Sequence, residues 1–275
     1  MNRFTFSLLV LASMLVQSAF SATVDTVSVH SAKMNKNVKA VVVKPQSYNT
    51  RTSFPVLYLL HGYSDNYSGW VQKAPVIKEL ADRYDMIILC PDGAFGSWYF
   101  DSPTDEEFQY ETFVAKELVE WVDKNYKTIP SREARAVTGL SMGGHGGLYL
   151  GFRHQDVFGA CGSMSGGVDI RPFPNNWDIA KRIGAQPEFP ERWEQNTVMG
   201  LLHLLTPGST KIIIDCGTDD FFYEVNEKLH RELLYRNIPH DYISRPGAHN
   251  WEYWNNAIKY QALFFSDYFS SGEKP

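Results

Sequence analysis

The sequence has few cysteines, little positive charge and no long apolar run, and each shortage excludes a class of protein. Its 275 residues include three cysteines and neither a C-x-x-C nor an H-E-x-x-H motif, so we predict no metal site and no cofactor. The formal net charge is −5 without a Lys/Arg-rich run, which argues against nucleic acid as a partner. The chain contains no repeat and no low-complexity linker, and its 44% of hydrophobic residues suffice for one buried core.

The N-terminus has the pattern of a secretory signal peptide. Arg3 supplies positive charge ahead of an apolar stretch at 4–16, and a small-x-small cleavage site ends at Ser21. The apolar stretch is interrupted by serines and is shorter than the ~20 residues of a membrane-spanning helix. We therefore predict a signal peptide over 1–21 and export to the periplasm or the medium. The mature chain, 22–275, is expected to form a single domain without stable membrane insertion.

Cys90, Cys161 and Cys216 are an odd number of thiols for an exported protein, so at least one stays unpaired. Each lies in or beside an apolar, strand-like run. We expect all three to be buried as small hydrophobic side chains.

Apolar periodicity divides the chain into strands and helices. Residues 24–29 and 38–43 alternate apolar and polar side chains, as a half-buried antiparallel hairpin does. Further strands are expected at 54–60, 86–90, 134–138, 159–164, 211–215 and 240–245. Helices are expected at 76–83, 111–126, 144–153, 222–236 and 251–269. This alternation predicts an α/β fold with a mostly parallel sheet covered by helices on both faces.

One long segment, 165–209, lacks a regular period and is too long for a plain loop. Apolar clusters at 177–179 and 198–205 predict short helices over the carboxyl edge of the sheet. The segment is a cap candidate. A structural excursion that does not touch substrate is the alternative.

Gly139-Leu140-Ser141-Met142-Gly143 stands where an apolar strand meets a glycine-rich helix. This order resembles the nucleophile elbow of α/β-hydrolases, in which a strained turn pushes the serine Oγ clear of the sheet. Side chains two residues before and after the serine would collide across so tight a turn. The motif predicts a nucleophilic Ser141. The alternative is a glycine-rich turn with an inert serine, which has the same sequence pattern.

A serine hydroxyl needs an imidazole to take its proton and a carboxylate to orient that imidazole. In an α/β-hydrolase the acid follows a later strand and the histidine comes last. Here Asp219 and Asp220 follow the strand at 211–215, and His249 follows the last strand. The spacing from Gly217 resembles the acid loop of that superfamily, so we predict Asp220 as the acid and leave Asp219 to the turn.

An oxyanion that develops during acyl transfer needs two fixed N–H donors. The backbone amide of Met142, next to the nucleophile, supplies one, and we predict that the amide of Tyr63 supplies the other. His145 follows Ser141 by one helical turn and is expected to pack or hydrogen-bond beneath it. His61 is expected to hold the loop that carries Tyr63.

Four motifs occur in order: Leu-Leu-His-Gly at 59–62, Gly-Leu-Ser-Met-Gly-Gly-His-Gly at 139–146, Asp-Cys-Gly-Thr-Asp-Asp at 215–220 and Pro-Gly-Ala-His at 246–249. Together they resemble the esterase D family, and the similarity runs from about residue 38 to the end. That family includes acetyl xylan and feruloyl esterases, S-formylglutathione hydrolases and mycolyltransferases. S-formylglutathione hydrolases generally have histidine just before the nucleophile, where this chain has Leu140.

The resemblance implies an exported serine carboxylesterase that acts on acetyl or feruloyl esters of plant polysaccharides or oligosaccharides. Alternatives are a thioesterase of the S-formylglutathione hydrolase type, an acyltransferase of the mycolyltransferase type, and a non-catalytic carbohydrate-binding protein. Trp70 and Trp251 are predicted to contact the substrate. They belong to an aromatic group near the expected site that also includes Tyr63, Tyr67, Trp98, Tyr99, Phe100 and Trp254.

Overall fold

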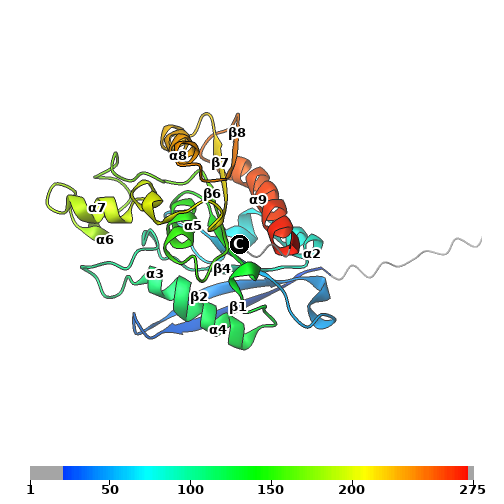
Figure 1. The fold of residues 1–275 in the computed structure, drawn as a ribbon. Helices are drawn as coiled ribbons and strands as arrows, with labels where there is room; N and C mark the ends of the chain where they lie inside the picture. The colour runs from blue at the N-terminus through cyan, green and yellow to red at the C-terminus, as the bar shows by residue number, and fades with distance from the viewer. Residues whose placement is uncertain (1–20, 272–275) are drawn as a thin grey trace, which may run out of the picture.

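The computed structural model describes residues 21–271, and its centre is an eight-stranded sheet (Figure 1). The strands lie in the order β1-β2-β4-β3-β5-β6-β7-β8. Their bounds are Thr23–Ser31, Lys36–Lys44, Val56–Leu60, Ile87–Pro91, Arg135–Gly139, Ala160–Met164, Lys211–Gly217 and Asp241–Arg245 for β1 to β8. The predicted signal peptide lies, apart from Ser21, outside the described residues.

The pairing of the strands confirms a mostly parallel sheet that begins with a hairpin. β1 pairs antiparallel with β2, and β2 pairs antiparallel with β4. All later neighbours, from β4–β3 to β7–β8, are parallel. From Thr23 to Ser31, β1 alternates exposed positions with half-buried or buried ones after its first residue because one of its faces meets solvent, whereas every residue of β3 is buried.

Helices connect the strands and cover the sheet. Their bounds are α1 Gly69–Lys73, α2 Val76–Arg83, α3 Tyr110–Thr112, α4 Leu118–Asn125, α5 Met142–Arg153, α6 Ile179–Ile183, α7 Pro190–Asn196, α8 Tyr223–Tyr235 and α9 Trp251–Ser271. Short 3-10 helices span Gln46–Asn49, Arg132–Ala134 and Val198–Leu204. The helix expected at 111–126 is interrupted by a π-helical turn at Phe113–Glu117. Apolar spacing does not reveal such a turn because one extra residue shifts the helical register only locally.

The sheet separates two hydrophobic cores, as β3 illustrates. Val56, Tyr58 and Leu60 belong to the core that contains the apolar faces of α4, α5 and α8. Leu57 and Leu59 belong to the core on the side of α2 and α9. Both leucines are fully buried, and each such side chain contributes roughly 2 kcal/mol of transfer free energy. Strong burial on both faces makes the carboxyl ends of the central strands rigid supports for the loops that follow them.

The three cysteines are free and buried, which confirms the expectation that they are core side chains. Burial raises the pKa of Cys161 to about 12, so this thiol stays protonated. Thiolate chemistry is therefore not offered by Cys161 at neutral pH.

The segment 165–209 contains the short helices that its apolar clusters predict. α6 begins at the end of the first cluster and the 3-10 helix Val198–Leu204 lies in the second, while α7 lies between them and was not predicted. Trp193 of α7 is fully buried and its indole N–H donates to Gly184 O at 2.9 Å. Within residues 21–271, no helix combines the length and apolar character needed to cross a membrane.

Candidate active site

Ser141 occupies a sharp turn between β5 and α5. Its backbone has φ 56° and ψ −115°, a conformation that costs a non-glycine residue roughly 1–3 kcal/mol. The turn is held to the sheet, because the Ser141 N–H donates to Met164 O of β6 at 2.9 Å. The strain is therefore compensated by the surrounding sheet.

Gly139 and Gly143 stand where no side chain fits. A Cβ on Gly139 would lie 2.5 Å from Leu60 O and 2.6 Å from Gly143 O. A Cβ on Gly143 would lie 2.5 Å from Leu60 O and 2.6 Å from His61 O. The contact between Gly139 and Gly143 confirms the predicted crowding across the turn, and the contacts with Leu60 O show that the turn also packs against the end of β3.

The structure brings Ser141, His249 and Asp220 together from three strand-end loops. His249 Nε2 lies 2.9 Å from Ser141 Oγ, and His249 Nδ1 lies 2.9 and 3.0 Å from the two Asp220 oxygens. Since a carboxylate oxygen accepts hydrogen bonds, we assign the hydrogen to Nδ1, which leaves Nε2 free to accept from the Ser141 hydroxyl. This is the protonation pattern that a general base requires.

The structure also distinguishes between the two neighbouring aspartates. Asp220 is buried, and one of its oxygens accepts a hydrogen bond from the Phe222 N–H at 2.8 Å. Asp219 is exposed, and its N–H donates to Gly247 O at 2.9 Å. Asp219 therefore ties the acid loop to the loop of His249 through its backbone, while its carboxylate does not contact the histidine.

Two backbone amides beside Ser141 are available as donors. The N–H groups of Met142 and Tyr63 have no hydrogen-bond partner in the part of the chain that the structure describes. Met142 is the first residue of α5, where helix geometry leaves the amide without an intrahelical acceptor. Gly62, Tyr63 and Ser141 line the same cavity. These positions suit an oxyanion hole.

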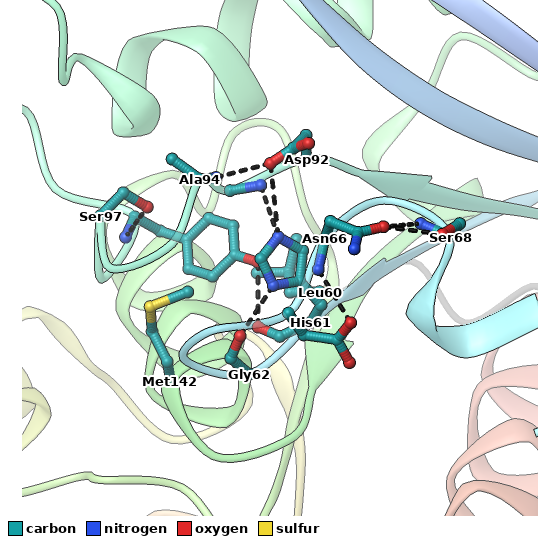
Figure 2. A network of polar contacts seen from close by, with 12 residues as sticks. Leu60, His61, Gly62, Asn66, Ser68, Asp92, Ala94, Ser97 and Met142 are labelled. Carbon is teal, nitrogen blue, oxygen red and sulfur yellow. Dashed lines mark hydrogen bonds and ion pairs between the residues drawn. The ribbon is translucent and has the colours of Figure 1, made fainter. Parts of the chain in front are cut away.

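His61 fastens the loop after β3, which also carries Tyr63, and Figure 2 shows His61 between Gly62 of this loop and Asp92 of the loop after β4. Its Nε2 accepts from the Gly93 N–H at 2.7 Å, and its Nδ1 lies 2.8 Å from Gly62 O, to which it donates. The Tyr99 hydroxyl donates to His61 O at 3.1 Å. The expectation that His61 holds this loop is confirmed, because its buried ring joins the loops after β3 and β4.

His145 lies beneath the nucleophile turn, where it was expected to pack. It is fully buried, stacks on Tyr149 at 5.4 Å, and donates from Nδ1 to Gly167 O at 3.1 Å. Burial lowers the pKa of His145 to about 4, so the ring is neutral at pH 7. The prediction of a packing role is confirmed.

A cavity of about 300 Å³ opens above Ser141 and His249. One part of its wall is aromatic and another carries an ion pair. The lining residues are Gly62, Tyr63, Ser64, Asp65, Lys73, Trp98, Leu140, Ser141, Trp177, Phe221, Phe222, His249, Trp251 and Trp254. No group of three or more His, Cys, Asp or Glu side chains within residues 21–271 could hold a metal ion.

The prediction that Trp70 contacts substrate is wrong. Trp70 is fully buried, and its indole N–H donates to Leu60 O at 3.0 Å. Its ring packs edge-on against Trp251 at 5.2 Å, so it supports Trp251, which does line the cavity. Both tryptophans lie near the site, but only burial in the folded chain decides which one reaches the cavity.

Trp177, Phe221 and Phe222 are wall residues that the sequence reasoning missed. Phe221 is 55% exposed and lies 4.2 Å from the His249 ring, and Trp177 stacks on Phe221 at 5.8 Å. The two phenylalanines directly follow Asp220, so their place beside the predicted acid was the available signal. Lys73 and Asp65, paired at 3.0 Å, form the charged part of the wall, and no local motif marks them.

Comparisons with known proteins point to one family. A family model described as "Putative esterase" matches residues 31–265. The acetyl esterase of Caldicellulosiruptor saccharolyticus is 27% identical over 258 residues, 84% of this chain and 94% of that protein. A diacylglycerol acyltransferase/mycolyltransferase of Mycobacterium tuberculosis is 25% identical over 276 residues, 86% of this chain and 79% of that protein. The solved structure of a ferulic acid esterase matches with a TM-score of 0.78 and 29% identity, covering 91% of this chain and all of that one.

Proposed function

We propose that this chain, which belongs to the esterase family, is an exported serine carboxylesterase for acetyl or feruloyl esters of plant polysaccharides or oligosaccharides. The observation that carries the proposal is the chain of hydrogen bonds from Ser141 through His249 to Asp220 at the base of an aromatic cavity. The acetyl esterase and ferulic acid esterase relatives support the substrate class.

The first half-reaction follows from the hydrogen positions. His249 Nε2 takes the hydroxyl proton as Ser141 Oγ forms a bond to the ester carbonyl carbon. The carbonyl oxygen gains the negative charge and lies against the amides of Tyr63 and Met142, each such donor contributing roughly 3 kcal/mol to transition-state stabilisation. When the tetrahedral intermediate collapses, the ester C–O bond breaks and His249 passes its proton to the departing sugar oxygen.

In the second half-reaction, a water molecule takes the place of the Ser141 hydroxyl as the nucleophile. His249 Nε2 takes a proton from water as the water oxygen attacks the acyl-enzyme carbonyl carbon. The bond to Ser141 Oγ then breaks, Ser141 regains a proton from His249, and the free acid leaves. Asp220 accepts the Nδ1 hydrogen throughout and stabilises the imidazolium that forms in each step.

The size of the cavity supports a compact acyl group. About 300 Å³ is at the lower end of the range for small-molecule sites, which suits an acetyl or a single aromatic acyl group better than a long lipid chain. Aromatic walls suit the flat face of a sugar or a feruloyl ring. Short acyl chains are therefore expected to react faster than long ones.

A substrate panel tests the proposal. Initial rates are measured on acetylated and feruloylated xylo-oligosaccharides, simple alkyl esters of the same acids, and S-formylglutathione. The expected result is the highest kcat/KM on the sugar-linked esters. Faster turnover of S-formylglutathione would contradict the carbohydrate assignment, and no turnover of any ester would contradict the esterase assignment.

Acyl transfer to a sugar is the second candidate, because one relative is a mycolyltransferase. The same acyl-enzyme serves both reactions, and they differ in whether water or a hydroxyl acceptor attacks it. Adding xylo-oligosaccharide acceptors to an aryl acetate reaction separates them. Hydrolysis predicts free acetate in proportion to the released phenol, whereas transfer predicts acetylated oligosaccharide in the products.

A further inference from the structure

The Tyr63 side chain joins the loop after β3 to the segment 165–209. Its hydroxyl donates to Asp178 Oδ2 at 3.0 Å, across 115 positions of the sequence. Asp178 directly precedes α6. Tyr63, which lines the cavity, is therefore attached through its own side chain to the segment 165–209.

The Asp178 carboxylate does not cap helix α6, although Asp178 stands at its N-cap position. Asp178 stands at the N-cap of α6, where an aspartate ordinarily accepts from the helix amides, yet its side chain makes no capping hydrogen bond. It accepts instead from Tyr63 and pairs with Lys181 at 2.7 Å. The hydrogen bond from Lys181 lowers the pKa of Asp178, so the carboxylate is ionised and can only accept.

The backbone at Asp178 is held in an unfavourable conformation. Trp177 and Asp178 have φ of 50° and 58°, in the left-handed region that non-glycine residues seldom occupy. The Trp98 indole N–H donates to Trp177 O at 2.9 Å, and the Trp177 ring stacks on Phe221. Such strain persists only where the surroundings fix it, which makes Asp178 a rigid acceptor.

Tyr63 is fixed at several points. Its ring packs edge-on against Phe95 at 4.8 Å, and the next residue, Ser64, donates its N–H to Phe95 O at 2.7 Å. Burial and then the hydrogen bond to Asp178 raise the pKa of Tyr63, so its phenol keeps the proton that it donates. His61 fixes the loop on the other side. The Asp178 contact completes the restraint by holding the far end of the Tyr63 ring.

We propose that Asp178 is a positioning residue: by holding the Tyr63 phenol, it orients the Tyr63 backbone N–H toward the oxyanion. The inference rests on the proposed esterase function. A charge-assisted hydrogen bond is about twice as strong as a neutral one, and a displacement near 1 Å at an active site can cost up to about 100-fold in rate. The segment 165–209 thereby affects the chemical step and not only substrate binding.

The test compares Tyr63→Phe, Asp178→Ala and Asp178→Asn with the unaltered protein on p-nitrophenyl acetate. Loss of the link is expected to lower kcat roughly 10-fold while KM changes less than about twofold, a smaller effect than the 10²–10³ lost with an entire oxyanion donor. Asp178→Asn should recover most of kcat, because its amide oxygen still accepts from the phenol. The double variant Tyr63→Phe/Asp178→Ala should be no slower than either single variant, since both remove one link.

A matched control is available in another tyrosine–aspartate pair, Tyr126 with Asp25 at 3.3 Å, in which Asp25 belongs to β1. Tyr126→Phe should leave kcat unchanged. Thermal unfolding of each variant identifies any general loss of fold, and Tyr63→Phe, which keeps the ring, carries the test if Asp178→Ala unfolds. Unchanged kcat in Tyr63→Phe, additive losses in the double variant, or an increase in KM alone would overturn the positioning role. An inactive unaltered protein would instead overturn the esterase proposal together with this inference.

Discussion

The strand-end loops and the segment 165–209 contribute to one cavity in different ways. The loops after β5, β7 and β8 carry Ser141, Asp220 and His249, whose side chains lie within hydrogen-bond distance of one another. The segment 165–209 contributes Trp177 to the wall and holds Tyr63 through Asp178. The loops directly follow parallel strands, of which β5 and β7 are almost entirely buried and β8 is partly exposed. The segment consists of short helices and turns with left-handed residues.

This difference separates the chemistry from the shape of the site. Groups that exchange protons must be placed within tenths of an ångström, and the ends of parallel strands hydrogen-bonded into one sheet provide that rigidity. Residues that only form a wall tolerate variation, so they can come from an irregular segment. We therefore expect changes in the loops to act on kcat for every ester. Changes in the wall should act on the choice of substrate, and Asp178 is the proposed exception.

Among the tests of this comparison, substitution of Asp220 is expected to change kcat most. Asp220→Asn should lower kcat by about 10⁴, because an amide at this position favours the wrong His249 tautomer. Asp219→Asn is the matched control and should change kcat less than about twofold, because the Asp219 carboxylate does not contact His249. Steady-state kinetics on p-nitrophenyl acetate measures both. The opposite ranking would assign the acid role to Asp219.

His145 links the two regions, and its burial predicts a pH-dependent stability. The ring is neutral in the folded protein, where burial lowers its pKa to about 4 from the ordinary histidine value of 6.5. The contribution is fully present above pH 6.5 and is lost as the pH falls toward 4, since the unfolded chain binds the proton first. At pH 5 the expected loss is about 2 kcal/mol relative to pH 7.

Urea unfolding at pH 7 and pH 5 measures this loss. The same experiment on His145→Gln, which keeps a side-chain donor for Gly167 O, should show a smaller fall in the free energy of unfolding between the two pH values. An equal fall in both proteins would assign the pH dependence to other groups. Glu111, whose pKa is lowered to about 2, contributes mainly below pH 4.5 and does not account for it.

The smallest expected effect is at Trp177. Trp177→Ala removes a wall residue and leaves the Ser141–His249 pair intact. It should lower kcat/KM on feruloyl esters by roughly 3–10-fold, the contribution of one aromatic contact, and change acetyl ester hydrolysis less. Rates on methyl ferulate and p-nitrophenyl acetate measure the ratio. Equal losses on both substrates would mean that Trp177 supports the chemistry, and the distinction between loops and wall would fail there.

The sequence predicts the strand-end loops better than the wall, for a physical reason. Ser141 and its flanking glycines form a local motif, because a strained turn imposes requirements on neighbouring residues. Asp220 follows a strand recognisable from its apolar run at 211–215, and His249 is marked by its place after the last expected strand. Trp70 and Trp177 have no such local signal: whether a tryptophan is buried or reaches a cavity depends on segments distant in the sequence. The π-helical turn at Phe113–Glu117 is likewise not visible in the apolar spacing.

Covalent labelling tests the central claim, that Ser141 is the nucleophile, most directly. The protein is treated with a fluorophosphonate, digested, and analysed by peptide mass spectrometry, with Ser141→Ala treated in parallel. We expect one adduct, on Ser141, no adduct on the folded Ser141→Ala protein, and loss of ester hydrolysis in that variant by several powers of ten. An adduct on another serine, such as the nearby buried Ser163 or Ser165, or near-full activity of folded Ser141→Ala, would contradict the account.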